Sequence, residues 1–231
     1  MDLVLQGLRE AAMLIVRLDP ELCEILWLSL WVSALAVAAA LVIGVPAGVF
    51  LGLRSFPGRG LLATLVNAGM GLPPVVVGLF VFLLLARSGP LGGLGLLYTP
   101  AAMVLAQIVL AVPLVIGVTM AAIQDLDERL HLQILALGAS RWQLYVKLVI
   151  EARASLLAAL AAAFGAVISE VGAVIMVGGN IRGQTRVMTT AIVLETRQGN
   201  FALAIALSLV LLLAAVAVNA AFTAVQRGRG R

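Results

Sequence analysis

Long apolar stretches, separated by short charged segments, dominate this chain. Five of them carry no charge or a single acid, and they run over residues 25–53, 60–86, within 88–124, 154–177 and 201–226. Each is longer than the roughly 20 residues with which a helix crosses the hydrocarbon of a bilayer. None alternates as a barrel strand would, and lipid admits only helices or closed barrels. The pattern predicts an all-α integral membrane protein with five transmembrane helices.

The N-terminal segment, residues 1–24, differs from these spans because it mixes apolar and charged residues. Its apolar positions recur near helical spacing: Leu3, Leu5, Leu8, Ala12, Ile15 and Val16. We expect an amphipathic helix on the membrane surface, ended by Asp19 and Pro20 before the first span. Residues 1–231 are interpreted as a single transmembrane domain.

Composition agrees with this class. Hydrophobic residues make up 63% of the chain and charged residues only 11%, with a mean hydropathy of +1.15, whereas soluble domains carry about 25% charged residues. The net charge of +4 comes from cations at the edges of the apolar stretches, where membrane proteins place them. We therefore expect lipid around the chain and no nucleic-acid partner.

The sequence offers few residues that could serve in catalysis or metal binding. The chain has one cysteine, Cys23, and one histidine, His131, too few for a metal site built from cysteines or histidines, and we expect no Ser-His-Asp triad. A phosphate-binding loop needs a Gly-Lys pair, and the one lysine, Lys147, follows Val146. We expect no cofactor, no metal site and no enzyme activity in this chain, so any ATP and Mg²⁺ would bind to a separate subunit.

The cations between the spans predict an orientation. With the N-terminus outside, the inner side would hold nine cations: Arg54, Arg59, Arg129, Arg141, Lys147, Arg153, Arg227, Arg229 and Arg231. The outer side would hold six: Arg9, Arg17, Arg87, Arg182, Arg186 and Arg197. Because inner loops carry the excess of Lys and Arg, we expect the N-terminus outside and the C-terminus inside.

Small residues recur at four-residue spacing within two spans. One row is Gly44, Gly48 and Gly52, and the other is Ala161, Gly165, Ser169 and Ala173. Such rows let helix backbones approach closely in a membrane. They indicate either close packing within the chain or a contact between two copies of it.

Prolines inside the apolar stretches predict irregular helices. Pro46, Pro113 and the pair Pro73–Pro74 should kink or break them, and the pair, which follows Gly69 and Gly71, is the strongest candidate. A broken helix at membrane depth is often part of a transport path, although a simple kink explains the same residues.

The longest polar interruption, residues 125–153, is expected on the inner side. Leu126, Leu130, Ile134 and Leu137 lie three or four residues apart, as on one face of a helix. Gly138 suits the left-handed end of that helix, and Ser140 with Gln143 forms a capping-box pattern for the next one. The corner would expose Trp142 to water, which indicates either a partner surface or an interfacial helix with a tryptophan anchor.

This corner resembles a known segment. The run Leu137, Gly138, Ala139, Ser140, Arg141 and Trp142 is similar to the glycine-centred cytoplasmic loop of ABC-importer permeases, called the EAA loop, which docks into the ATPase subunit. The Glu-Ala-Ala of that family falls on Leu132–Ile134 here, and its Leu-Pro falls on Ile150–Glu151. The resemblance implies that residues 125–153 form a coupling loop.

A second block is more specific. Residues 169–181 are similar to the Glu-Phe-Gly…Gly-Asn-Ile segment of molybdate and tungstate permeases, and residues 185–196 look like the tungstate branch. The segments 73–79 and 89–92 fit the same family, so the resemblance covers roughly residues 26–212. It implies a type I ABC importer permease of the MetI and molybdate-permease kind, which moves an oxyanion, most closely tungstate, across the inner membrane. Molybdate or another oxyanion is the alternative.

The same resemblance implies the partners: a second copy of the chain, two ATPase subunits, and a periplasmic or extracellular oxyanion-binding protein. An ion-coupled transporter is the alternative mechanism. It would need several intramembrane acids or histidines, and Glu170 is the one acid inside a predicted span.

Polar residues near the predicted outer end are candidates for the oxyanion path or an outer gate: Asn180, Thr185, Arg186, Thr189 and Thr190. They could donate hydrogen bonds to an oxyanion, or they could order an outer loop. Glu170 would repel a divalent anion, so we expect it to stay neutral or to accept hydrogen bonds from helix-terminal N–H groups or an arginine, such as Arg186. Gln107 is expected to form an interhelical hydrogen bond.

Overall fold

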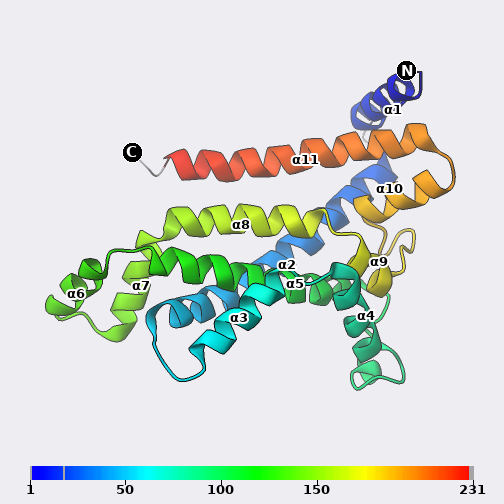
Figure 1. The fold of residues 1–231 in the computed structure, drawn as a ribbon. Helices are drawn as coiled ribbons and strands as arrows, with labels where there is room; N and C mark the ends of the chain where they lie inside the picture. Colours follow the sequence, from blue (N-terminus) through cyan, green and yellow to red (C-terminus); the bar gives the residue numbers. More distant parts are fainter. Residues whose placement is uncertain (1, 18, 229–231) are drawn as a thin grey trace.

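The computed structural model describes residues 2–17 and 19–228, and the regular elements among these residues are all helices (Figure 1). The α-helices are α1 (Asp2–Arg17), α2 (Pro20–Leu53), α3 (Arg59–Met70), α4 (Pro74–Leu85), α5 (Pro100–Gln124), α6 (Glu128–Ala136), α7 (Arg141–Glu151), α8 (Arg153–Ile168), α9 (Gly172–Gly178), α10 (Met188–Arg197) and α11 (Phe201–Gly228). A short 3-10 helix, η1, covers Gly92–Leu94. The predicted all-α class is confirmed.

Three helices, α2, α5 and α11, are each long and apolar enough to cross a membrane. Two further candidates are bent pairs: α3 and α4 meet at 101°, and α7 and α8 meet at 66°. Counting each bent pair as one span gives five, which agrees with the number of apolar stretches. The exact number of crossings stays a prediction.

The fourth apolar stretch, residues 154–177, does not form one continuous helix. α8 ends at Ile168 and α9 begins at Gly172, so Glu170 lies in the gap between them. The Glu170 side chain accepts a hydrogen bond from the backbone of the next helix, and Gly172 follows two residues later. Both features favour a turn here over a continuous apolar helix. The expectation of a single helix there is wrong.

The glycine row of α2 packs within the chain, against α5. A Cβ added to Gly44, Gly48 or Gly52 would lie within 3 Å of Val115, Thr119 and Ile123 respectively. The contacting residues increase in number in the same direction on both helices, so α2 and α5 are parallel. The chain between them must therefore cross back, and α3 with α4 makes that crossing.

Two of the expected proline sites leave their helices unbroken. α2 continues through Pro46 and α5 continues through Pro113, whereas the chain breaks before Pro74. Neighbouring helices can satisfy the carbonyls that a proline frees, and α3 covers Pro113, since a Cβ on Gly69 would lie 2.8 Å from it. The prediction of a break holds for the Pro73–Pro74 pair alone.

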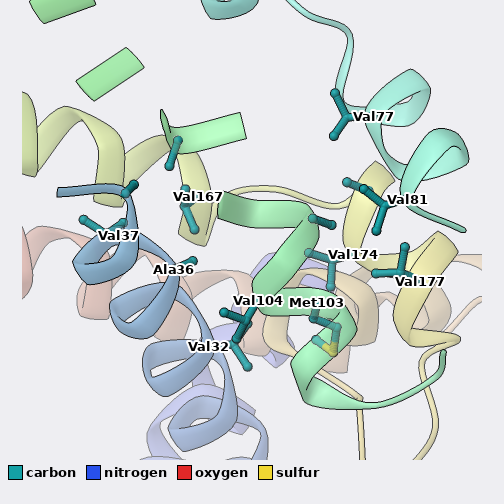
Figure 2. Packing of buried hydrophobic residues seen from close by; sticks show 14 of the residues in the cluster. Val32, Ala36, Val37, Val77, Val81, Met103, Val104, Val167, Val174 and Val177 are labelled. Atoms are coloured by element: carbon teal, nitrogen blue, oxygen red, sulfur yellow. The ribbon is translucent and has the colours of Figure 1, made fainter. Parts of the chain in front are cut away.

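The main core lies where α2, α4, α5, α8 and α9 meet (Figure 2). Val32 of α2, Val81 of α4, Met103 of α5, Val167 of α8 and Val177 of α9 are all buried there. The core holds the two broken segments, α4 and α9, against the continuous helix α5.

At the N-terminus, α1 packs beside α11 (Figure 1). The contact is close, because a Cβ on Gly7 would lie 2.5 Å from the side chain of Ile205. Asp19 then caps α2, accepting a hydrogen bond from the N–H of Leu22 at 3.0 Å. The position of α1 on a membrane surface stays a prediction.

The two candidate regions lie at opposite ends of the molecule. α6 and α7 form one end, and α9 and α10 lie toward the other (Figure 1). α11 runs between the ends. Arg229 and Arg231, two of the predicted inner cations, lie outside the described residues.

Candidate functional site in the translocation path and the coupling loop

The helices that follow the breaks at residues 71–73 and 169–171, α4 and α9, contact each other. A Cβ added to Gly78 of α4 would lie 2.6 Å from the Cα of Ala173 in α9, and one added to Gly172 would lie 2.6 Å from a methyl group of Val75. The break before α4 and the break before α9 are therefore side by side. Broken helices that meet within a membrane domain are where transporters place substrate paths.

Glu170 occupies the second break. Its Oε1 accepts a hydrogen bond from the N–H of Ala173 at 3.1 Å, and its carbonyl accepts one from the Thr189 hydroxyl at 2.9 Å. The expected bond to a helix-terminal N–H group is thus present. The proposed partner Arg186 is wrong, because its Nη1 lies 3.5 Å from Oε1 of Glu21.

A small polar cavity lies under this break. Ser29 and Ser33 of α2, Gln107 of α5, Glu170 and Thr189 contribute its polar groups, and it offers about 10 Å³ to the centre of a water-sized sphere. That is roughly the room of one water molecule. The sequence analysis missed Ser29 and Ser33, although two hydroxyls four residues apart in an apolar span place both on one helix face.

Gln107 makes the interhelical hydrogen bond expected of it. Its Nε2 donates to the carbonyl of Val167 in α8 at 3.2 Å. Its Oε1 is buried and has no hydrogen-bond partner among the described residues. The side chain therefore fixes α5 to α8 and keeps one free acceptor beside the cavity.

The threonines of the outer loop are fully engaged with the backbone. The Thr185 hydroxyl donates to the carbonyl of Gly178 at 2.5 Å and accepts from the N–H of Ile181 at 3.0 Å. The Thr190 hydroxyl exchanges hydrogen bonds with the backbone of Val187 at the start of α10. Together with Thr189, they favour the loop-ordering interpretation over direct oxyanion binding.

Asn180 and Arg186 keep unused polar atoms. Asn180 has a left-handed backbone with φ of +53°, its Nδ2 donates to the carbonyl of Thr190 at 3.4 Å, and its Oδ1 is buried without a partner in the described part of the chain. Arg186 pairs with Glu21, as does Arg182, and its Nε is likewise buried and unpaired there. Of the five outer candidates, Arg186 keeps a free donor, which could bind an oxyanion, and Asn180 keeps a free acceptor, which could not.

At the opposite end, the predicted helix, glycine corner and helix are confirmed. α6 ends at Ala136 and Gly138 has φ of +80°. The capping box is present: the N–H of Ser140 donates to Oε1 of Gln143 at 2.7 Å, and the N–H of Gln143 donates to Oγ of Ser140 at 3.3 Å.

The corner is anchored on one side and open on the other. Leu126, Leu130 and Ile134 pack against the core formed by the ends of α2, α5 and α7. Leu137 is 87% exposed and Trp142 is 73% exposed. Two large apolar side chains at an ordered turn offer a surface for a partner.

Comparisons with known proteins agree with this arrangement. Residues 44–231 match the family model described as "Binding-protein-dependent transport system inner membrane component". The chain is 39% identical to the tungstate uptake system permease protein TupB of Peptoclostridium acidaminophilum, over 98% of this chain and 99% of that one. It is 43% identical to a probable anion ABC transporter permease of Haloferax volcanii, over 86% of this chain and 88% of that one.

Among solved structures, an inward-facing MetNI methionine ABC transporter has a similar chain, with a TM-score of 0.72 and 18% identity over 90% of this chain and 95% of that one. The fold is that of an ABC importer permease. Such a protein is a multi-pass component of the inner membrane that works with an ATPase and a substrate-binding protein. The chain belongs to the family of binding-protein-dependent transport system inner membrane components, as a non-catalytic permease subunit of an ABC importer.

Proposed function

We propose that this chain forms the membrane path for an oxyanion, most closely tungstate, into the cytoplasm. The observation that carries the proposal is the likeness to a tungstate uptake permease over nearly the whole of both chains. Molybdate is the nearest competing substrate, since tungstate and molybdate have the same charge and shape. The energy comes from ATP bound with Mg²⁺ by a partner subunit, and this chain binds no cofactor.

The path follows the junction of α4 and α9. A divalent oxyanion is best held for a short time by neutral donors, because a permanent cage of arginines would bind it too tightly to release it. Ser33 contributes a neutral hydroxyl to the cavity beside this junction. The Nε2 of Gln107 and the hydroxyl of Thr189 already donate to backbone carbonyls, so these two side chains order the lining in this proposal. Glu170 accepts a hydrogen bond from the N–H of Ala173, which supports a structural role for this acid.

At the outer end, Asn180 and Arg186 form the gate in this proposal. Both keep a buried polar atom without a partner among the described residues, and such atoms are costly unless another group binds them. Thr185, Thr189 and Thr190 support the gate by holding the loop, as their backbone hydrogen bonds suggest.

The corner from Leu137 to Trp142, which includes Ala139 and Arg141, docks the ATPase subunit in this proposal. Its support is the combination of a fixed turn at Gly138 with exposed apolar side chains. Motion of the ATPase would reach α8 through α7, because the two helices are joined at Ala152 with a 66° bend.

A second copy of the chain completes the membrane domain. α3 has no buried residue, and α4 exposes Val75 and Phe80. The predicted row of Ala161, Gly165, Ser169 and Ala173 is interrupted by the end of α8 at Ile168, and of its residues Gly165 has open space at its Cβ position. A dimer would cover these surfaces, with the N-terminus outside and the C-terminus inside, as the cation distribution favours.

The test is reconstitution of the complex in vesicles with the ATPase subunit and the binding protein. ATP hydrolysis should rise most with tungstate, less with molybdate and least with sulfate. The binding protein also selects the substrate and can stimulate hydrolysis by itself. The control is therefore vesicles with the binding protein and no oxyanion, whose rate of hydrolysis is subtracted. Equal stimulation by sulfate would contradict the tungstate assignment, and no stimulation by any oxyanion would contradict the substrate class.

A further inference from the structure

A groove lies between α2 and α7, beside the corner that the proposed function assigns to the ATPase, and it shares Trp142 with that corner. It is almost entirely apolar, with a volume of about 490 Å³, and Val45, Val49 and Phe50 of α2 face Trp142, Val146 and Val149 of α7 across it. This volume falls within the range of ligand sites in proteins, about 300–1,000 Å³. The groove can hold a long apolar group.

A second groove continues from the first, past Tyr145, which lines both. Its volume is about 290 Å³, and its polar lining includes Arg54, His131 and Arg141. Arg54 donates from Nε to the hydroxyl of Tyr145 at 3.4 Å, so the guanidinium lies at the junction. The second groove can hold a negative group.

His131 gives the second groove an unused polar atom. Its Nε2 is buried and has no hydrogen-bond partner in the residues that the structure describes. Neither arginine has a carboxylate partner within salt-bridge distance there, since the ion pairs of the described chain involve Arg182 and Arg186. An anion in the groove would therefore find two free cations and one free nitrogen.

We propose that the two grooves together form a binding site for one anionic phospholipid. An acyl chain would occupy the apolar groove, and the phosphate would lie among Arg54, His131 and Arg141. Basic pockets between transmembrane helices on the cytoplasmic side suit anionic head groups, and the proposed orientation places this end there. The site extends the proposed function and does not depend on which substrate is carried.

The depth of the site agrees with this occupant. The apolar run of α2 ends at Leu53, directly before Arg54, and tryptophan and tyrosine favour the interface between membrane and water. Trp142 and Tyr145 therefore mark the level where a head group meets its chains. A free phosphate ion would leave the apolar groove empty, so a lipid explains both halves of the site.

Fluorescence of Trp142 tests the proposal directly. The double variant Trp27→Phe/Trp31→Phe keeps Trp142 as the single tryptophan of the three in the chain, and it serves as the parent for the further variants. The parent is placed in two series of bilayers, one with brominated phosphatidylglycerol and one with brominated phosphatidylcholine. We expect the fluorescence of Trp142 to be half quenched at a lower mole fraction of brominated phosphatidylglycerol than of brominated phosphatidylcholine. In Arg54→Gln/Arg141→Gln the preference should fall, by about fivefold for each arginine removed.

The matched control is Arg129→Gln, which removes an exposed cation of α6 outside the groove lining and should keep the preference. Arg54→Lys/Arg141→Lys should keep most of it. Equal quenching of the parent by both lipids overturns the proposal. It is also overturned if Arg129→Gln loses as much of the preference for phosphatidylglycerol as Arg54→Gln/Arg141→Gln does. Loss of quenching when the complete complex with its ATPase is assembled shows that the partner protein occupies the groove instead, and also overturns it.

Discussion

Gly78 of α4 and Ala173 of α9 pack backbone against backbone, so closely that a Cβ on Gly78 would lie 2.6 Å from the Cα of Ala173. One turn earlier on α4, Gly172 lies against a side-chain methyl group of Val75. Glycine is required here because a backbone atom, unlike the end of a side chain, cannot move aside alone. The contact holds the two breaks at a fixed separation.

Gly78→Ala should therefore destabilise the permease, by about 1–3 kcal/mol as for other overpacked sites, and should reduce transport. Thermal unfolding of the purified complex and uptake into vesicles measure the two effects. Gly60→Ala in α3 is the matched control, since a Cβ there meets nothing within 4 Å. An unchanged unfolding temperature and uptake in Gly78→Ala would show that the separation is not fixed by this contact.

Glu170→Gln should retain most of the transport, because the amide oxygen of glutamine can accept the same hydrogen bond from Ala173. Glu170→Leu removes that acceptor and leaves an N–H group of α9 unpaired, at a cost of about 1–3 kcal/mol. Recovery of the assembled complex and its uptake rate distinguish the variants. If Gln abolishes uptake while assembly and ATP hydrolysis persist, then the negative charge itself is needed.

At the other end of the molecule, Gly138→Val should uncouple ATP hydrolysis from transport. The backbone at Gly138 is left-handed, which costs other residues about 1–2 kcal/mol and is most unfavourable for a β-branched side chain. Gly138→Asn is the control, because asparagine tolerates this conformation. Copurification of the ATPase and oxyanion-stimulated hydrolysis are measured, and normal stimulation in the valine variant would argue against docking at this corner.

The orientation can be tested with a reporter that is active only outside the cytoplasm. Inserted near Gly183, in the loop between α9 and α10, it should give a signal. Fused after Arg231, which lies outside the described residues, it should give none. The opposite result at either position would reverse the orientation and place the α6–α7 corner away from the ATPase.

Two copies of the chain are expected in each complex. Mass measurement of the intact complex in detergent should give twice the 24.0 kDa of this chain for the membrane part. A cysteine pair formed by Gly165→Cys in both copies would locate the contact on α8, provided that Cys23 is first replaced by serine. One copy with a different permease would indicate a heterodimer.

Features set by neighbours in the chain could be read from the sequence. The α6–α7 corner depends on periodic leucines, one glycine and the Ser140–Gln143 pair, all within a few residues. The bond of Glu170 to a helix N–H is equally local, since Ala173 is three residues away. These predictions needed no knowledge of which helices are in contact.

Features set by distant contacts could not be read in this way. The pairing of Arg186 with Glu21 joins residues 165 positions apart, and nothing in the local sequence favours Glu21 over Glu170. The bond from the Thr189 hydroxyl to the carbonyl of Glu170 likewise depends on how α10 lies beside the second break, 19 residues away. The unbroken course of α5 through Pro113 depends on its cover by α3.

The close fit of Gly44, Gly48 and Gly52 against α5 has a mechanical consequence. If α2 slid along α5 by one residue, larger side chains would clash at all three glycine contacts at once. The pair therefore resists sliding and behaves as one rigid unit. Alternating access to the two faces of the membrane must then come from the parts that are not locked to it in this way. We expect that movement at the breaks at residues 71–73 and 169–171, where α4 and α9 would turn together against the α2–α5 pair.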